Sequence, residues 1–76
     1  MTEFDLELDT SGLTCPLPLL KAKKALNGLD SGSRLKVVAT DPGSERDFQV
    51  FAEQSGHKLL GHDAKDGIYT YLLEKK

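Results

Sequence analysis

The sequence predicts a two-layer α/β sandwich of the α+β kind, in which two helices cover one face of a four-stranded mixed sheet. Two observations predict this fold. Short segments with a two-residue apolar repeat alternate with segments whose apolar residues recur every three or four positions, and the last two strand-like segments are joined by a tight turn. The resulting order is β-α-β-α-β-β. A chain of 76 residues has no room for a second core, so residues 1–76 form one domain.

The first strand is predicted from Phe4, Leu6 and Leu8, which alternate with acidic residues and should face the core. A helix is expected from Pro16 to Asn27. Pro16 suits the first helical position, since its φ is fixed near the helical value and its missing N–H would have no partner there. The inward face of this helix is apolar: Leu19, Ala22, Leu26 and, at its edge, Ala25.

The second half of the chain continues the alternation. Gly28 is expected to end the first helix in the left-handed conformation, and a strand follows from Arg34 to Thr40. The second helix is expected to begin with either Asp41 or Ser44 as its N-cap. In the latter case Asp47, three residues later, would complete a capping box with Ser44. The inward residues of this helix are Phe48, Phe51, Ala52 and Ser55, and Gly56 ends it.

The last two strands are predicted to form an antiparallel hairpin over residues 57–64 and 68–73. Asp66 and Gly67 are typical of a tight hairpin turn, and the irregular pattern near Gly61 indicates a bulge. Right-handed crossovers place both helices on the same face of the sheet, provided that successive parallel strands step in one direction.

The single cysteine, Cys15, directly precedes Pro16 and therefore falls at or beside the start of the first helix. The dipole of a helix favours an anion there, and a cysteine in such a place can titrate below its ordinary pKa of about 8.5. Pro18 is tolerated in the first turn, whose N–H groups have no carbonyl to reach. A buried, purely apolar role for Cys15 is the alternative.

Composition narrows the class of function. One cysteine excludes an internal disulfide and indicates a reducing compartment, and the acidic start of the chain is unlike a signal peptide, so a cytoplasmic protein is expected. The apolar runs are too short to span a bilayer. A net charge of −2 gives no general attraction to nucleic acid or to an anionic membrane.

Other side chains are weaker candidates for chemistry. His57 and His62 are expected on opposite faces of a strand and do not make a zinc site with Cys15, so no metal or other cofactor is predicted. Neither histidine is an obvious base for Cys15. Tyr69 and Tyr71 could stack on bases, but in a chain without a basic stripe they are expected to cover the sheet.

Gly12-Leu13-Thr14-Cys15-Pro16-Leu17-Pro18 resembles the Gly-Leu-x-Cys-Pro-x-Pro motif of the TusA/SirA-like family of sulfur-carrier proteins. Asp41-Pro42 at the start of the second helix and the aromatic residues of the last strand strengthen the resemblance, which covers essentially the whole chain. It implies that Cys15 carries sulfane sulfur as a persulfide. A cysteine desulfurase or another donor would load the thiol, and an acceptor protein would take the sulfur for tRNA thiolation, molybdenum-cofactor maturation or related sulfur metabolism.

Gly12, Pro16 and Pro18 would then support the thiol, with Gly12 letting the preceding loop approach closely. Lys21 and Lys24 on the first helix and Arg46 on the second are candidates for binding an acidic partner, as is the neighbouring Lys23. Such a carrier is expected to act as a monomeric relay rather than as an enzyme with independent turnover.

Two alternatives stay open. One is a regulatory or protein-interaction module in which Cys15 is structural. The other is a single-stranded RNA binder, which the net charge of −2 disfavours.

Overall fold

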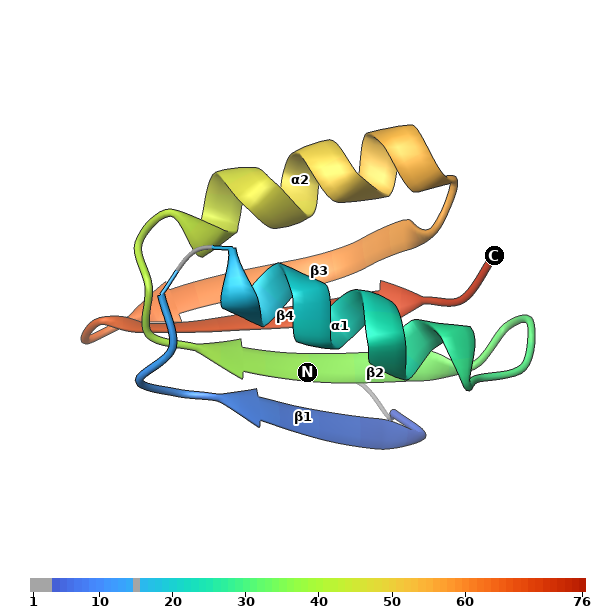
Figure 1. Ribbon diagram of the computed structural model, residues 1–76, viewed down its shortest axis with the longest axis horizontal. Coiled ribbons are helices and arrows are strands. Elements are labelled where there is room, and N and C mark those ends of the chain that lie inside the picture. The colour runs from blue at the N-terminus through green and yellow to red at the C-terminus, as the bar shows by residue number, and fades with distance from the viewer. Residues whose placement is uncertain (1–3, 15) are drawn as a thin grey trace.

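The computed structural model describes residues 4–14 and 16–76. The sheet has the strand order β1-β2-β4-β3; β1 is parallel to β2, whereas β4 is antiparallel to both of its neighbours. Both helices lie on one face of this sheet (Figure 1), so the predicted fold class is confirmed. The elements are β1 (Leu6–Thr10), α1 (Leu17–Asn27), β2 (Arg34–Ala39), α2 (Ser44–Ser55), β3 (Lys58–Lys65) and β4 (Ile68–Glu74).

The core lies between the helices and the sheet. Three alternate residues of β2 are fully buried, as the two-residue repeat predicted. Ala22 and Leu26 of α1 are also fully buried, and α2 contributes its two phenylalanines. The core cluster comprises Ala22, Leu26, Leu35, Val37, Ala39, Phe48, Phe51, Tyr71 and Leu73.

The start of α1 differs from the prediction by one residue. Pro16 is the N-cap residue, with φ −98° and ψ 16°, and the helix begins at Leu17. Pro18 then occupies the second helical position, where its side chain is buried. The exit also differs. Gly28 has φ −91° rather than a left-handed conformation, because its N–H reaches the Ala25 carbonyl at 3.1 Å and tightens the last turn.

At the start of α2, neither predicted N-cap is correct. Gly43 holds that position, without a side-chain hydrogen bond, and the helix begins at Ser44. The Ser44 hydroxyl does not cap the helix because it forms a buried hydrogen bond with the Tyr71 hydroxyl, at 2.7 Å. Gly56 ends the helix with φ +86°, as predicted.

The apolar pattern at the start of the chain is only partly realised as core. Phe4 and Leu6 are 40% and 41% exposed, because β1 is an edge strand and Phe4 precedes it beyond a bend. The Phe4 ring instead lies 5.2 Å from Nζ of Lys36. Leu8 is half-buried and Thr10 is buried.

The C-terminal hairpin follows the prediction closely. Asp66 and Gly67 have φ of 53° and 78°, the left-handed pair that a type I′ turn requires. The register between β3 and β4 shifts between Leu59 and Gly61, which confirms the bulge. The extra residue also breaks the alternation that placed the two histidines on opposite faces. His62 pairs with Tyr71, whose ring faces the helices, while His57 contacts Phe51 of α2, so that prediction is wrong.

Candidate functional site: the loop between β1 and α1

The topology brings two loops to one edge of the sheet. Because β1 and β2 are parallel neighbours, their carboxyl ends meet at the same end of the molecule, where both helices begin (Figure 1). In α/β folds, loops at this edge are the usual place for ligands and chemistry. By sequence, the Cys-Pro-x-Pro segment begins at the end of the first of these loops and continues into the first turn of α1.

Hydrogen bonds fix the first half of the β1–α1 loop. The Gly12 N–H donates to Oγ1 of Thr40 at 2.8 Å, across 28 positions of sequence. The Leu13 N–H donates to the Thr10 carbonyl at 3.1 Å, which closes a tight turn directly after β1. The loop is therefore tied both to its own strand and to the end of β2.

Asp9 supports the same turn. Its Oδ1 accepts a hydrogen bond of 3.0 Å from the Ser11 N–H. Hydrogen bonds from the Ser11 hydroxyl and N–H lower the pKa of this carboxyl, with burial opposing them. Asp9 thus stays ionised and keeps accepting these bonds well into the acid range.

The role of Gly12 differs from the one predicted. Within residues 4–14 and 16–76, no atom lies within 4 Å of the position that a Cβ would occupy, so among these residues the glycine does not serve a close approach. Its φ is +82°, a conformation that residues with side chains rarely adopt. A glycine is required here by the positive φ of the turn, and not by close neighbours among the described residues.

Cys15 lies outside the described residues, as does its predicted place beside the N-cap. Its sequence neighbours Thr14, Pro16 and Leu17 are all exposed, and the Leu17 N–H donates to the Thr14 carbonyl at 2.9 Å. The chain on both sides of the cysteine therefore runs over the surface at the start of α1.

The candidate partner-binding residues are exposed. Lys21 and Lys24 lie three positions apart on the outer face of α1, and Arg46 lies near the start of α2. Lys23 differs, since its Nζ is 5.6 Å from the centre of the Phe51 ring and covers the edge of the core. Among the described residues, no hydrogen bond or ion pair joins Arg46 to the lysines of α1.

Two features of this region were not predicted from the sequence: the exposed leucines at the start of α1 and the contact between the loop and the end of β2. Leu17 and Leu20 are 44% and 50% exposed beside the lysines of α1. The exposure of Leu20 could have been predicted, because Leu20 lies off the apolar face of the helical repeat. The contact of Thr40 with Gly12 had no signal, because a threonine at the end of a strand is ordinary.

The tyrosines are not available for stacking on bases as a pair. Tyr71 is 1% exposed and stacks on Phe48, with ring centroids 4.5 Å apart. Burial raises the pKa of its hydroxyl, although its hydrogen bond with the Ser44 hydroxyl opposes this. Tyr69 packs against the core cluster. Their predicted role in covering the sheet is confirmed.

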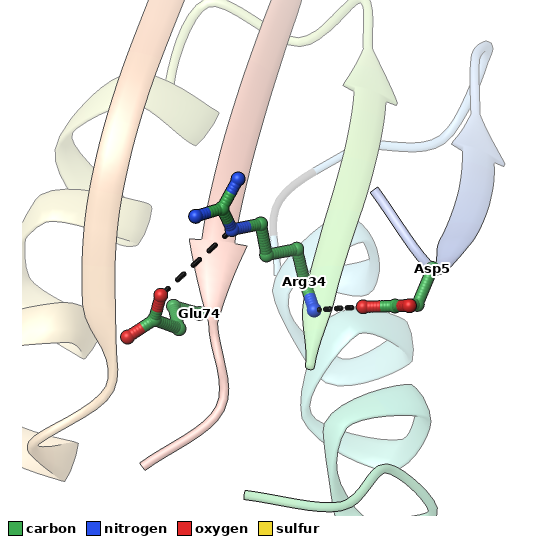
Figure 2. Close-up of polar contacts among 3 residues, drawn as sticks. All are labelled: Asp5, Arg34 and Glu74. Carbon is green, nitrogen blue, oxygen red and sulfur yellow. Dashed lines mark hydrogen bonds and ion pairs between the residues drawn. The ribbon is translucent and has the colours of Figure 1, made fainter. Parts of the chain in front are cut away.

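An open hollow of about 620 Å³ lies at the other end of the sheet, lined by Phe4, Asp5, Gly32 and Arg34. Figure 2 shows Arg34 between two carboxylates. Asp5 Oδ2 accepts the Arg34 backbone N–H at 2.8 Å, and Glu74 Oε2 is 3.8 Å from Nε. The guanidinium is thus paired with Glu74, while Asp5 binds the backbone, and the hollow is remote from the β1–α1 loop.

Within residues 4–14 and 16–76, no three histidine, cysteine or acidic side chains are grouped so as to hold a metal ion. Neither described helix combines the length and hydropathy that a bilayer-spanning segment needs.

Comparison with known proteins gives one consistent family. A family model described as "Sulfurtransferase TusA" matches residues 6–75. A "Sulfur carrier protein TusA" from Allochromatium vinosum is 52% identical over 75 residues, which covers 99% of each chain. A protein of the same name from Pseudomonas entomophila is 43% identical over 72 residues, covering 95% of this chain and 90% of the relative.

The fold agrees with a solved structure as well. The crystal structure of a SirA-like protein from Desulfitobacterium hafniense has a TM-score of 0.82 and 29% identity, and the match covers 92% of this chain and 96% of that one. Sequence and fold thus give the same answer over nearly the whole chain, and the protein belongs to the TusA family.

Proposed function

We propose that this protein is a small sulfur carrier that accepts sulfane sulfur as a persulfide on Cys15 and passes it to an acceptor protein. The names of its relatives support a carrier role. The observation that carries the proposal is the exposure of Thr14, Pro16 and Leu17 around the only cysteine of the chain. A carrier thiol has to enter the active sites of two other proteins, and a surface loop permits this.

The loading step is redox-neutral. The thiolate of Cys15 attacks the outer sulfur of the donor's persulfide, so that a new S–S bond forms on Cys15 while the donor's S–S bond breaks and its cysteine leaves as a thiolate. The rate depends on the thiolate fraction of Cys15. Passing the sulfur on repeats the same displacement with the acceptor as the attacking group.

The cysteine count supports transfer between proteins. Because the chain has one cysteine, no second thiol within it can displace the sulfur by forming a disulfide. The persulfide therefore waits for a separate acceptor. A cysteine desulfurase or a similar donor and an acceptor in tRNA thiolation, molybdenum-cofactor maturation or related sulfur metabolism fit such a relay, which acts as a cytoplasmic monomer without direct contact to nucleic acid.

The outer face of α1 is the proposed docking surface. Exposed Leu17 and Leu20 supply apolar area, and Lys21 and Lys24 add positive charge beside them, with Arg46 contributing from α2. An apolar surface with an acidic rim on the partner is the matching chemistry.

The first experiment is intact mass spectrometry after incubation with cysteine and a cysteine desulfurase. We expect a gain of one sulfur atom, roughly 32 Da, that a reductant wash removes and that Cys15→Ala abolishes. A gain that persisted in Cys15→Ala would contradict the assignment. No gain with any persulfide donor would favour an interaction module with a structural cysteine.

A further inference from the structure

We propose that Thr40 is a positioning residue for the thiol of Cys15, because its hydroxyl fixes the loop that carries the cysteine. This inference rests on the proposed function and adds a residue from another part of the chain to it. Thr40 directly follows β2, whereas the loop follows β1. The two are joined by the hydrogen bond of 2.8 Å from the Gly12 N–H to Oγ1 of Thr40.

The end of β2 is a firm support for such a bond. Oγ1 of Thr10, which is 1% exposed, donates to the Val38 carbonyl at 2.6 Å and ties the last residue of β1 to β2. Thr10 and Ala39 are partners in the parallel register, and Ala39 is fully buried. Thr40 therefore extends a fixed strand pair, and its hydroxyl holds the loop in a constant place relative to the sheet.

The loop is held on both sides of the cysteine. On one side, Gly12 is fixed by Thr40 and by its turn conformation, with φ +82°. On the other, the Thr14 carbonyl accepts the N–H of Leu17, the first residue of α1. Only Leu13 and Thr14 separate the Thr40 anchor at Gly12 from Cys15, so the freedom of the thiol depends on that anchor.

Loss of the anchor should change reactivity more than stability. Thr40 is half-buried and outside the core cluster, and Gly12 is exposed, so water can replace the lost partner of the Gly12 N–H. The loop then samples more conformations, so we expect Cys15 to spend less time in the place beside the start of α1 that the sequence predicts for it. Because the helix dipole favours an anion only at that end, the thiolate becomes less favourable.

The test compares Thr40→Val, which removes the hydroxyl at constant shape, with Thr40→Ser, which keeps it. Alkylation of Cys15 by iodoacetamide is followed against pH by intact mass. In Thr40→Val we expect the midpoint of the profile to rise by roughly 0.2–0.7 pH unit, the range set by the preference of an exposed helix N-terminus for an anion. Thr40→Ser should keep the wild-type midpoint.

A matched control and a second measurement separate this role from a general loss of structure. Thr70→Val makes the same change in β4, where the residue is half-buried as well, and should leave the profile unchanged. In the wild-type protein, hydrogen exchange of the Gly12 amide should be slower than its intrinsic rate. This second measurement needs no variant and applies even if Thr40→Val does not fold.

An unshifted profile in Thr40→Val, an equal shift in Thr40→Ser or Thr70→Val, or exchange of the Gly12 amide at its intrinsic rate would overturn the positioning role. Alkylation needs no sulfur donor, so it is independent of the loading experiment. A chain that shows the Thr40 effect but never gains sulfur would refute the carrier function and leave the loop anchor standing.

Discussion

At the scale of single residues, His57 joins the end of the chain to the end of α2. Its Nδ1 accepts the Lys76 backbone N–H at 2.9 Å, and its ring lies 5.5 Å from that of Phe51. Burial is the main cause that lowers the pKa of His57 from 6.5, and the charges of Lys75 and Lys76 add to it. Lys23 faces the same Phe51 ring from α1, so every charged side chain in these contacts is a cation.

This environment predicts a loss of stability in mild acid. The folded state favours neutral His57, so the unfolded chain binds the proton more readily once the pH falls below about 6.5. The contribution of neutral His57 to the free energy of unfolding is therefore complete above this pH. It is lost as the pH falls through the lower pKa of His57 in the folded state. Urea unfolding between about pH 7 and 5 measures the loss.

Two variants test this expectation: asparagine replaces His57 in one and His62 in the other. His57→Asn keeps an acceptor close to the place of Nδ1 but does not titrate, so part of the pH dependence should disappear. His62 is exposed, and His62→Asn should leave the dependence unchanged. Equal pH dependence in wild type and His57→Asn would contradict the expectation.

At the scale of elements, α1 has two faces of different character, and docking is proposed for only one of them. Its inner face packs on the sheet through Pro18, Ala22 and Leu26. Its outer face exposes leucines and lysines beside the β1–α1 loop. Changes on the outer face can therefore alter docking without touching the core.

Reversal of charge at Lys21 and Lys24 together should weaken sulfur loading by the donor. Because exposed charges act mainly on association, we expect a loss of about ten-fold or more in the loading rate at low salt, and a smaller loss at high salt. The alkylation rate of Cys15 by a neutral reagent should change little. The reaction with the desulfurase, followed by mass, provides the measurement.

The matched control is the double reversal of Lys58 and Lys65, which are exposed at the two ends of β3. It changes the net charge equally but leaves the face of α1 intact, so loading should remain near the wild-type rate. An equal loss in both double variants would attribute the effect to net charge and not to docking on α1.

At the scale of the whole molecule, one core unites both helices with the central strands β2 and β4. Leu26 of α1 and Leu73 of β4 are both fully buried in it, although they are 47 positions apart in the sequence. Since side chains of both helices meet in this one cluster, the elements should unfold together.

Leu26→Ala should lower the free energy of unfolding by about 2–5 kcal/mol, a large share of what so small a domain has. Urea unfolding followed by far-UV circular dichroism and by tyrosine fluorescence should give one coincident transition. Leu20→Ala, at a residue that is 50% exposed, should change the free energy by less than about 0.5 kcal/mol. Two separate transitions in either protein would show that the helices do not share one core.

Periodicity was sufficient to predict the elements and most of the core. The alternation in β2, the apolar face of α1 and the turn at Asp66-Gly67 each have a strong local cause, so they were predictable without tertiary information. The buried face of β1 was not, since burial of Phe4 and Leu6 depends on what covers an edge strand.

The details at helix ends and in the site depended on distant partners. Ser44 resembles an N-cap in the sequence, but its hydroxyl is taken by Tyr71, 27 positions away. The partner of Gly12 is Thr40, 28 positions away. A motif can locate a cysteine loop, whereas the side chain that holds the loop follows another strand, and nothing in the sequence near the motif indicates it.

The strand order has a consequence for how the protein is made. β4 lies between β2 and β3, yet it is the last strand in the chain. During synthesis from the N-terminus, β3 has no neighbour in the sheet until β4 has left the ribosome, and the inner face of α2 lacks Tyr71, on which Phe48 stacks. The native sheet therefore cannot form until residues 68–74 have emerged, because β4 is the strand that joins β3 to β2.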